Sequence, residues 1–571
     1  MQLPLLPQQI KQELVSQNLV TPERFDEVAA EAERKNQNLL DVLVSSKIAS
    51  AGFLGDLVAK ALGVDRADFS VRPIDKSIVR VLPEDVARQR QAIVFNREEN
   101  GVYDVAMLDP NDLEAISFLT QRLKAKIKPF LGTSEDLNRG FSVYGYELEK
   151  DFKKLIEENI KASLISKSET IEEAATRLPI VAIVENILSY AVSSRASDIH
   201  IEIIEDSMLI RYRIDGILYE ITSVTPVVHP AIAARIKILA GLKIDEHFKP
   251  QDGRFRHQIV NQSIDVRVSV MPTFYGEKVE MRLLDASQKP ISLEELGFSR
   301  PDTQLISENL KRTYGMILSC GPTGSGKTTT LYAMMNILNK TQVNVVTIED
   351  PIEYNMRYVN QTQINPQAGV TFASGLRALL RQDPNVIMVG EIRDSETANI
   401  AVQAALTGHL LVSSLHTNDA STAIPRLFDL DVPPFLVSSV LNLIIAQRLV
   451  RRICQSCMHS YEAPPELSAI IGNQYEILGV EEAHRKQLKV LYKGSGCALC
   501  NMTGYRGRLG IFEIIGITDS MRKLITAPSF DLGVVQAAAR RDGMKTMFED
   551  GLLKVELAFT TVDELLRVIQ E

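Results

Sequence analysis

A glycine-rich turn between an apolar run and a helical pattern restricts the fold of this chain more than any other feature. Residues 321–328 read Gly-Pro-Thr-Gly-Ser-Gly-Lys-Thr and match the pattern G-x-x-x-x-G-K-[ST] in full. The turn follows the apolar run Met316–Ser319 and opens a helical pattern that continues to Leu338. Glycines let the backbone curl around phosphates and direct N–H groups at them, and a helix N-terminus adds partial positive charge. The turn is therefore predicted to be a phosphate-binding P-loop.

The pattern also assigns roles to individual side chains of the predicted P-loop. Lys327 is expected to contact the β- and γ-phosphates of a nucleotide, and Thr328 is expected to bind Mg²⁺. The predicted nucleotide-binding residues are Gly321, Pro322, Thr323, Gly324, Ser325, Gly326, Lys327, Thr328 and Thr329.

Two apolar runs further along the chain end in carboxylates. The run 345–348 is followed by Glu349, Asp350 and Glu353, and the run 386–389 is followed by Glu391. A carboxylate at the carboxyl end of a strand beside a P-loop is where metal and attacking water are held. These runs therefore predict the second, acidic half of a nucleotide site.

Two histidines flank another short apolar run. His409 and His416 lie on either side of the predicted strand Leu410–Ser414, and the whole chain has eight histidines. This placement indicates γ-phosphate sensing or coupling of the site to a subunit interface. The alternative is a pair of hydrogen-bonded structural histidines.

The chain is long enough for several domains. Its 571 residues exceed what one hydrophobic core usually serves. Short helical patterns run to about residue 65, mixed strand and helix patterns to about residue 144, and a segment rich in Lys, Glu and Ser follows. Alternating segments with a hairpin signal at Asp215-Gly216 predict an α+β domain that ends near Asp285. Beyond Leu293, alternating strand and helix patterns predict a doubly wound α/β sheet.

Charge and hydropathy exclude some classes of protein. The net charge of -9 argues against a general nucleic-acid binder. The segment Met1–Lys11 lacks the basic start of a signal peptide. The apolar stretch Phe435–Val450 is too short and too interrupted to span a bilayer, and it is interpreted as a buried helix. We therefore expect a cytoplasmic protein that reaches a membrane only through partners.

Four of the five cysteines form two CxxC pairs. In a chain without a signal peptide this pattern favours metal over disulfides. Four thiolates suit tetrahedral Zn²⁺ and leave no open ligand position, so the predicted zinc is structural. A redox role would need a thioredoxin-like context, which the sequence lacks. The predicted zinc ligands are Cys454, Cys457, Cys497 and Cys500, and the fifth cysteine, Cys320, is expected to be a small buried residue.

Taken together, these motifs resemble the secretion ATPases of the type II secretion and type IV pilus class. The resemblance covers residues 170–571 strongly. In the P-loop region it rests on the Walker A run 321–328, an aspartate box at 347–353, a Walker B motif with glutamate at 389–394 and a histidine box at 407–417. Upstream, the runs 196–202, 213–216, 251–254, 266–269 and 282–284 resemble the family's second N-terminal domain, a PAS-like module.

The resemblance implies a fold and a domain plan. The expected fold class is α/β, with a RecA-like P-loop ATPase domain, a PAS-like α+β domain and a small N-terminal helical and α+β domain. The expected boundaries are 1–145 for an N-terminal regulatory or docking domain, 146–178 for a linker, 179–286 for the PAS-like domain and 287–571 for the ATPase domain, with a zinc element at 454–500.

The resemblance also implies a mechanism. The family forms hexamers that hold ATP between the P-loop domain and the neighbouring α+β domain, where Arg267 and Arg282 would reach the phosphates. Glu353 becomes a candidate to polarise the attacking water, with Glu391 supporting Mg²⁺ through water, although which carboxylate is the base stays open. Asp198, His200 and Glu202 alternate on one strand face; a metal site is conceivable, but the structural interpretation is preferred.

Partners and competing functions follow from the same resemblance. The tetracysteine element resembles that of assembly motors, whereas retraction motors generally lack it, so an extension motor is expected. It would act on a polytopic inner-membrane platform protein, together with a cytoplasmic docking protein, without binding nucleic acid directly. The alternatives are a hexameric P-loop DNA translocase or helicase and a scaffold with a degenerate P-loop. The sequence does not separate a pilus machine from a secretion machine.

A helical repeat opens the chain. The pattern of Leu14–Val20 recurs at Leu43–Ala49 and resembles a domain that binds cyclic di-GMP in some family members. Asn18, Ala32 and Lys47 replace residues that those members carry at the binding motif. These departures argue against cyclic di-GMP and favour docking of a partner.

Overall fold

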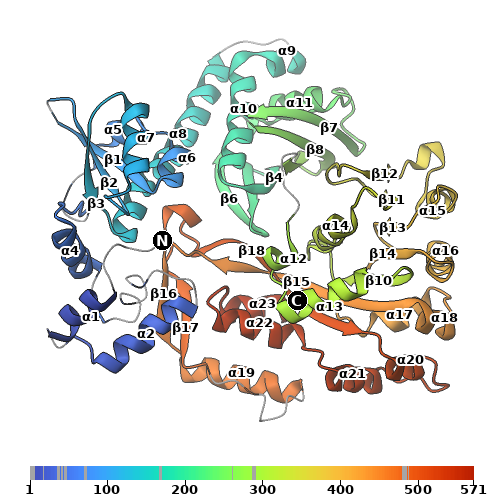
Figure 1. Cartoon of the computed structure of the whole chain (residues 1–571). Coiled ribbons are helices and arrows are strands. Elements are labelled where there is room, and N and C mark those ends of the chain that lie inside the picture. The colour runs from blue at the N-terminus through green and yellow to red at the C-terminus, as the bar shows by residue number, and fades with distance from the viewer. Residues whose placement is uncertain are drawn as a thin grey trace. The chain divides into compact units, whose positions relative to one another are not determined.

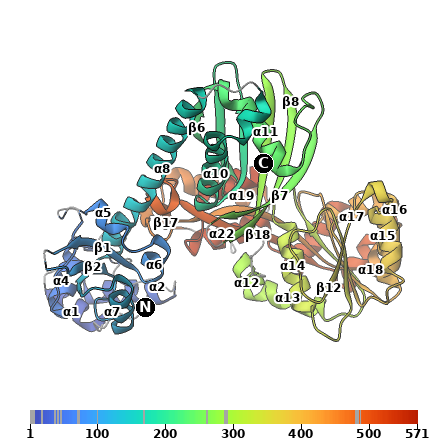
Figure 2. The same ribbon diagram turned by 90° about the horizontal axis from the view of Figure 1, so that it is seen from above.

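The computed structural model describes residues 7–16, 19–34, 39, 43, 48–49, 51–69, 72, 74–98, 100–165, 170–259, 262–285, 291–478, 485 and 488–570. The chain divides into two compact units. The first comprises Met1–Ser194, Arg452–Gly507 and Val555–Thr561, and the second comprises Arg195–Arg451, Arg508–Lys554 and Val562–Glu571. Figures 1 and 2 show the elements of both units from two directions. Most of the second copy of the N-terminal repeat lies outside the described residues.

The first unit begins with helices and a small three-stranded sheet. Strand β1 pairs antiparallel with β2, and β2 pairs parallel with β3 through the crossover helix α7, which Asp112 caps by accepting from the N–H of Ala115. The bounds are α1 Pro7–Ser16, α2 Pro22–Arg34, α4 Ala51–Leu62, α5 Lys76–Val79, α6 Glu84–Gln89, β1 Ala92–Arg97, β2 Tyr103–Met107, α7 Leu113–Leu123 and β3 Ile127–Leu131.

A long helix follows this sheet. Helix α8 runs without a break across residue 145, where the sequence placed the end of the N-terminal domain. Two more helices, α9 and α10, follow α8, and the first unit also includes the tetracysteine region. The bounds are α8 Ser134–Ile165, α9 Ile171–Thr176, α10 Leu178–Ser193, β16 Met458–Glu462, α19 Pro465–Ile477, β17 Val490–Gly494 and the 3-10 turn η4 Ala498–Cys500. Strands β16 and β17 form an antiparallel hairpin.

The second unit contains a six-stranded antiparallel sheet of order β6-β5-β4-β9-β8-β7, against which helix α11 packs (Figure 2). The turn between β5 and β6 falls at Asp215 and Gly216, both with positive φ, as the hairpin signal predicted. The bounds are β4 Ala196–Ile203, β5 Met208–Ile214, β6 Ile217–Val224, the turn η1 Pro226–Val228, α11 His229–Ala240, β7 Gln251–Ile259, β8 Gln262–Thr273 and β9 Gly276–Asp285.

The same unit contains a seven-stranded sheet of order β12-β11-β13-β14-β10-β15-β18 with helices between its strands. Strands β10 to β15 pair in parallel, and the inner ones are buried along their whole length, which is typical of parallel sheets. The strands are β10 Gly315–Cys320, β11 Val345–Glu349, β12 Val359–Gln363, β13 Val386–Val389, β14 Leu410–Leu415, β15 Leu441–Ile453 and β18 Tyr505–Gly516.

Helices complete the α/β part. Asp394 caps α16, and serine capping boxes begin α12 and α13. The bounds are α12 Leu293–Leu296, α13 Arg300–Leu310, α14 Lys327–Leu338, η2 Pro366–Ala368, α15 Phe372–Leu379, α16 Ser395–Leu406, α17 Ala423–Asp429, α18 Pro434–Val440, α20 Asp519–Ile525, α21 Leu532–Arg541, α22 Met547–Glu556 and α23 Val562–Gln570.

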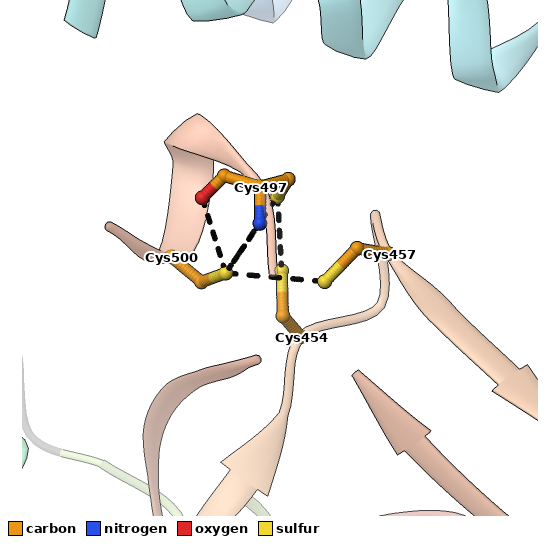
Figure 3. Close-up of side chains that lie close together, drawn as sticks. All are labelled: Cys454, Cys457, Cys497 and Cys500. Atoms are coloured by element: carbon orange, nitrogen blue, oxygen red, sulfur yellow. Dashed lines mark hydrogen bonds between the residues drawn. The ribbon is translucent and has the colours of Figure 1, made fainter. Parts of the chain in front are cut away.

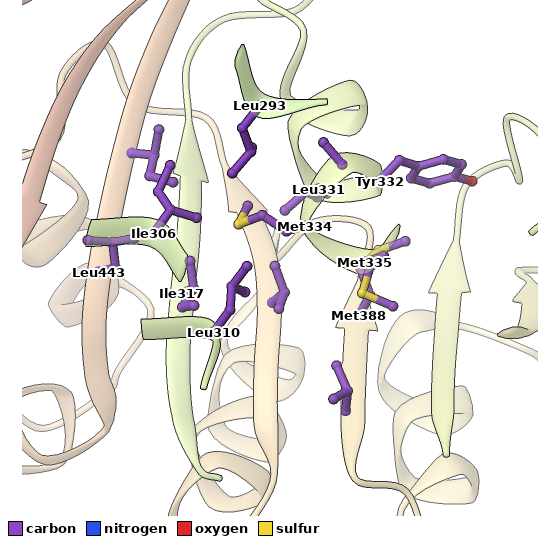
Figure 4. Packing of buried hydrophobic residues seen from close by; sticks show 14 of the residues in the cluster. Leu293, Ile306, Leu310, Ile317, Leu331, Tyr332, Met334, Met335, Met388 and Leu443 are labelled. Atoms are coloured by element: carbon purple, nitrogen blue, oxygen red, sulfur yellow. The ribbon is translucent and has the colours of Figure 1, made fainter. Parts of the chain in front are cut away.

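The helix that follows the P-loop is fixed by a buried apolar cluster. Leu331, Met334 and Met335 of α14 pack against strand residues such as Ile317 and Met388 (Figure 4). Burial of side chains of this size stabilises the fold by about 1.5–3 kcal/mol each. This packing holds α14, which begins directly after the P-loop, against the sheet.

One sequence interpretation is wrong. The stretch Phe435–Val450, expected to be a buried helix, forms the short helix α18 and then most of the long strand β15. Strand β15 is buried along most of its length, and a continuous apolar run does not distinguish a buried strand from a buried helix by periodicity. Across the described residues, no helix combines the length and the apolar character needed to cross a bilayer.

Candidate functional site

The P-loop connects β10 to α14 as its pattern predicts. Gly321, Gly324 and Gly326 all have positive φ, the region that favours glycine. A Cβ on Gly321 would lie 2.5 Å from Ser325 Oγ and 2.6 Å from the carbonyl oxygen of Gln447. Glycine is therefore required there by close approach as well as by backbone conformation.

Lys327 is folded into this loop. Its ammonium donates to the carbonyl oxygens of Gly321 at 2.7 Å and Pro322 at 3.0 Å. Burial lowers the pKa of Lys327, and the Glu391 carboxylate acts in the opposite direction. Thr328 is exposed one residue further on, so its hydroxyl is accessible to a metal ion bound with a nucleotide.

Gln447 of strand β15, which the sequence did not indicate as a site residue, holds the P-loop by hydrogen bonds. Its side-chain amide donates to the carbonyl oxygen of Ser325 at 2.8 Å, and its side-chain oxygen accepts from the hydroxyl of Ser319 at 3.3 Å. Only 1% of Gln447 is exposed. Because buried polar groups are held by their hydrogen bonds, Gln447 fixes the loop against the sheet.

Glu391 follows strand β13 and lies next to His416. His416 Nε2 lies 3.0 Å from one carboxylate oxygen of Glu391, and Arg393 donates to the other. Burial acts to raise the pKa of Glu391, but the hydrogen bonds from Arg393 and His416 bring it below its usual value. An ionised carboxylate here suits a role beside Mg²⁺.

The two histidines of the predicted histidine box are separated by the length of β14. His416 follows the carboxyl end of the strand and reaches Glu391, whereas His409 precedes its amino end. His409 Nδ1 lies 2.9 Å from the carbonyl oxygen of Ala404, near the end of α16. His409 therefore lies at the edge of the sheet opposite the P-loop.

The two arginines expected to reach the phosphates lie on adjacent strands of the antiparallel sheet, where Arg267 of β8 pairs in register with Arg282 of β9. Arg267 donates to the carbonyl oxygen of Ile352 at 3.0 Å and lies 3.5 Å from the Glu353 carboxylate. Arg282 Nε donates to Asp198 Oδ1 at 2.8 Å. This hydrogen bond raises the pKa of Arg282.

The alternating acids on β4 are paired with basic side chains. Asp198 lies near Arg282 and Arg213, and Glu202 lies 2.8 Å from Lys278 and 2.5 Å from Arg211. Burial would raise the pKa of Asp198, but hydrogen bonds from Arg282 and Ser197 lower it. This pairing accords with the structural interpretation of these residues.

One cavity of about 840 Å³, wholly within the second unit, brings most of these groups together. Residues 322–329 of the P-loop line it with Glu353, Glu391 and His416. From the antiparallel sheet come Asp198, Arg213 and Arg282. Arg267 and His409 are not among the lining residues. The volume lies within the range of sites for small molecules and cofactors.

Four sulfur atoms form a second candidate centre, in the first unit. Among the described residues, four side chains lie close enough together to hold a metal ion: Cys454, Cys457, Cys497 and Cys500 (Figure 3). Three sulfur pairs are separated by 3.7–3.9 Å. A tetrahedron with Zn–S bonds of about 2.3 Å has edges of about 3.8 Å. The cluster thus fits zinc, which would supply a structural cross-link.

The backbone around the cluster is built for sulfur ligands. The N–H groups of Cys497 and Gly504 donate to Cys500 Sγ at 3.1 and 3.3 Å, as they would to a thiolate. A Cβ on Gly494 would lie 2.1 Å from the carbonyl oxygen of Gly504. The two glycines that surround the second CxxC pair therefore let its flanking chains cross.

The cavity is surrounded by a P-loop, by carboxylates at the ends of neighbouring strands and by arginines on an adjoining sheet. This combination defines a P-loop nucleoside triphosphatase. The model of the family described as "Type II/IV secretion system protein" matches residues 173–567, and a domain model described as "MshEN domain" matches residues 62–149. The chain belongs to the type II/IV secretion system protein family and is an ATP hydrolase.

Relatives with assigned names are similar over most of the chain. The "Type IV pilus assembly ATPase PilB" of Myxococcus xanthus is 37% identical over 97% of this chain and 97% of its own length. The "Type II secretion system protein E" of Pectobacterium carotovorum is 39% identical over 86% of this chain and 97% of its own length. The solved Legionella pneumophila ATPase DotB is 23% identical, with a TM-score of 0.50 over 68% of this chain and 95% of that chain, which shows a shared fold.

Proposed function

We propose that the chain is the hexameric motor of a type IV pilus assembly or type II secretion machine and couples ATP hydrolysis to the assembly of pilin subunits. The observation that carries this proposal is the single cavity in which the P-loop, Glu353, Glu391 and Arg282 meet. The relatives named as pilus assembly and secretion proteins, which match nearly end to end, support it.

In the proposed reaction, the loop N–H groups and Lys327 bind the phosphates, and Thr328 and Glu391 hold Mg²⁺. Glu353 polarises the attacking water. Arg267 and Arg282 move onto the phosphates as the site closes, and His416 orients Glu391. The contact of Arg267 with Glu353 and Ile352 supports this assignment, because it lies beside the loop that carries the proposed base.

The remaining parts receive proposed roles outside the chemistry. Zinc on the four cysteines holds the base of the insert between the two CxxC pairs, as in an extension motor. The N-terminal region, including the residues that match the MshEN domain, docks a cytoplasmic partner. The chain acts in the cytoplasm at the inner membrane, to which a polytopic platform protein recruits it.

Three measurements on the full-length protein test this proposal. Native mass spectrometry should find six copies, phosphate release should show MgATP turnover, and affinity purification from the source cells should recover a polytopic membrane protein together with pilin-like subunits. Turnover stimulated by DNA, without such membrane partners, would instead indicate a translocase. Calorimetric titration with cyclic di-GMP asks whether the N-terminal region binds a nucleotide.

A further inference from the structure

Glu349, the last residue of strand β11, is a buried acid to which the proposed reaction gives no role. It is 2% exposed. One carboxylate oxygen accepts from Thr347 Oγ1 at 2.5 Å and from Gln361 Nε2 at 3.1 Å, and the other accepts from the hydroxyl of Tyr332. Since both oxygens already have donors, Glu349 is not arranged as a metal ligand.

Tyr332 connects this acid to the P-loop helix. It is the fifth residue of α14 after Lys327, and its ring is wholly buried in the cluster that anchors that helix. Its hydroxyl donates to Glu349 and accepts from the backbone N–H of Glu353 at 3.2 Å. A second donor, Gln361 Nε2, lies 3.4 Å away. The hydroxyl therefore links the Glu349 carboxyl group to the backbone N–H of Glu353.

The loop that carries Glu353 depends on these contacts. Residues 350–358 connect β11 to β12 without regular secondary structure. Tyr332 binds the N–H of Glu353, and Gln361 contributes by donating to the carbonyl oxygen of Tyr354 at 3.2 Å and accepting from the N–H of Met356 at 2.8 Å. The rings of Tyr332 and Tyr354 also pack edge to face, with centroids 4.5 Å apart. The loop is thus fastened from the P-loop helix.

The hydrogen bonds to Glu349 make the connection rigid. Burial raises the pKa of Glu349, and the hydrogen bonds from Thr347, Tyr332 and Gln361 oppose that change. Burial also raises the pKa of the Tyr332 hydroxyl, which keeps its proton as the donor. A buried acceptor such as Glu349 is destabilised when one of its donors is removed, whatever its protonation state.

We propose that Tyr332 and Glu349 are a positioning pair that holds Glu353 at a fixed place relative to the phosphates bound by the P-loop. Both residues line the nucleotide cavity, and the pair acts through Glu353. This inference rests on the proposed function, because it takes Glu353 to be the group that polarises the attacking water.

The test is Tyr332→Phe in the full-length protein, which removes one oxygen atom and keeps the packing. We expect kcat to fall by about 10- to 100-fold, as for a buried group that is left without its hydrogen-bond partner, while the directly measured dissociation constant for MgATP stays within about twofold. The same substitution is also made in a Glu353→Gln protein, whose residual hydrolysis rate is measured in long single-turnover incubations. There it should alter the residual rate by less than about twofold, because the group through which Tyr332 acts is gone.

Two further variants complete the design. Glu349→Gln replaces one acceptor oxygen of the carboxyl group with an amide donor and should reproduce the pattern of unchanged affinity and reduced kcat. This variant keeps the test available if Tyr332→Phe folds poorly. Tyr314→Phe removes a hydroxyl from an exposed tyrosine and should leave kcat unchanged.

The results distinguish a failure of the positioning role from a failure of the proposed function. A Tyr332→Phe protein with kcat within about twofold of the unaltered chain overturns the positioning role, and so does an equal fold-loss in the Glu353→Gln background. In both cases the proposed function stands if Glu353→Gln alone abolishes turnover. Full turnover by Glu353→Gln would overturn the role of Glu353 and the positioning pair together.

Discussion

Glu513 should make the second unit less stable as the pH rises. This residue of β18 is 7% exposed, and it accepts a hydrogen bond from the N–H of Ala420 at 2.9 Å. Burial raises the pKa of Glu513 to about 7, although the hydrogen bond from the Ala420 N–H acts to lower that pKa. In the unfolded chain a glutamate titrates at about 4.3. Between these values the folded protein holds a proton that the unfolded chain has released.

Stability is therefore greatest below the unfolded pKa and is lost as the pH rises towards 7. At about 1.4 kcal/mol for each pH unit, a span of roughly 2.7 units corresponds to about 3.7 kcal/mol, of which about 2.5 kcal/mol falls between pH 5 and pH 8. Because Glu513 is almost completely buried, solvent screening reduces this figure little.

The perturbation is Glu513→Gln, which is neutral at every pH and keeps a carbonyl oxygen to accept from Ala420. The variant should melt close to the unaltered protein at pH 5 and roughly 5–10 °C above it at pH 8. The assay is differential scanning fluorimetry at pH 5, 6, 7 and 8. Glu308→Gln, a change at an exposed glutamate, is the control. A difference in melting temperature that does not change with pH would refute the reasoning.

Four further predictions concern the two candidate sites. Lys327→Ala should weaken MgATP binding by about 100-fold or more, measured by calorimetry, because it removes charged hydrogen bonds to two phosphates. Glu391→Gln should keep that affinity but lower phosphate release by about 100-fold or more, and normal turnover would exclude the residue from the Mg²⁺ site. Gln447→Leu should weaken MgATP binding by about tenfold, because the P-loop loses its hydrogen bonds to the Gln447 side chain. Unchanged affinity would show that these hydrogen bonds are not needed for binding. Gly504→Ala, whose Cβ would lie 2.7 Å from the carbonyl oxygen of Gly494, should destabilise the cysteine region by about 2 kcal/mol and lower the zinc content measured by atomic absorption; full zinc occupancy would contradict the crossing argument.

The sequence predicted those parts of the site that are contiguous. The P-loop, the strand before it and the helix after it are adjacent in the chain, so one pattern defines their geometry. The acids at the ends of β11 and β13 were found for a similar reason, since parallel strands place their carboxyl ends at one edge of the sheet. Arg267 and Arg282 were named only through the resemblance to a family, and the register of β8 and β9 that sets them side by side was not predicted.

The parts that sequence reasoning missed depend on contacts between distant segments. Gln447 lies more than a hundred residues beyond the P-loop that it braces, in a stretch interpreted as a helix. In the sequence, Tyr332 looks like another apolar position of α14. The role of its hydroxyl is seen only from its contacts with Glu349 and the N–H of Glu353. A buried polar residue within an apolar run, such as Gln447 or Glu513, is the signal that could have drawn attention to them.

The crossing at Gly494 and Gly504 has a consequence for how this chain can vary. The two backbones meet there too closely for a side chain, and the four sulfurs lie beside them, so the two ends of the segment between the CxxC pairs are held together. Loop closure changes little in free energy with added length. Lengthening the connection between β16 and β17 should therefore leave the four cysteines in place, as long as Met458 and Tyr492 keep their packing with Ile453 and Ala558.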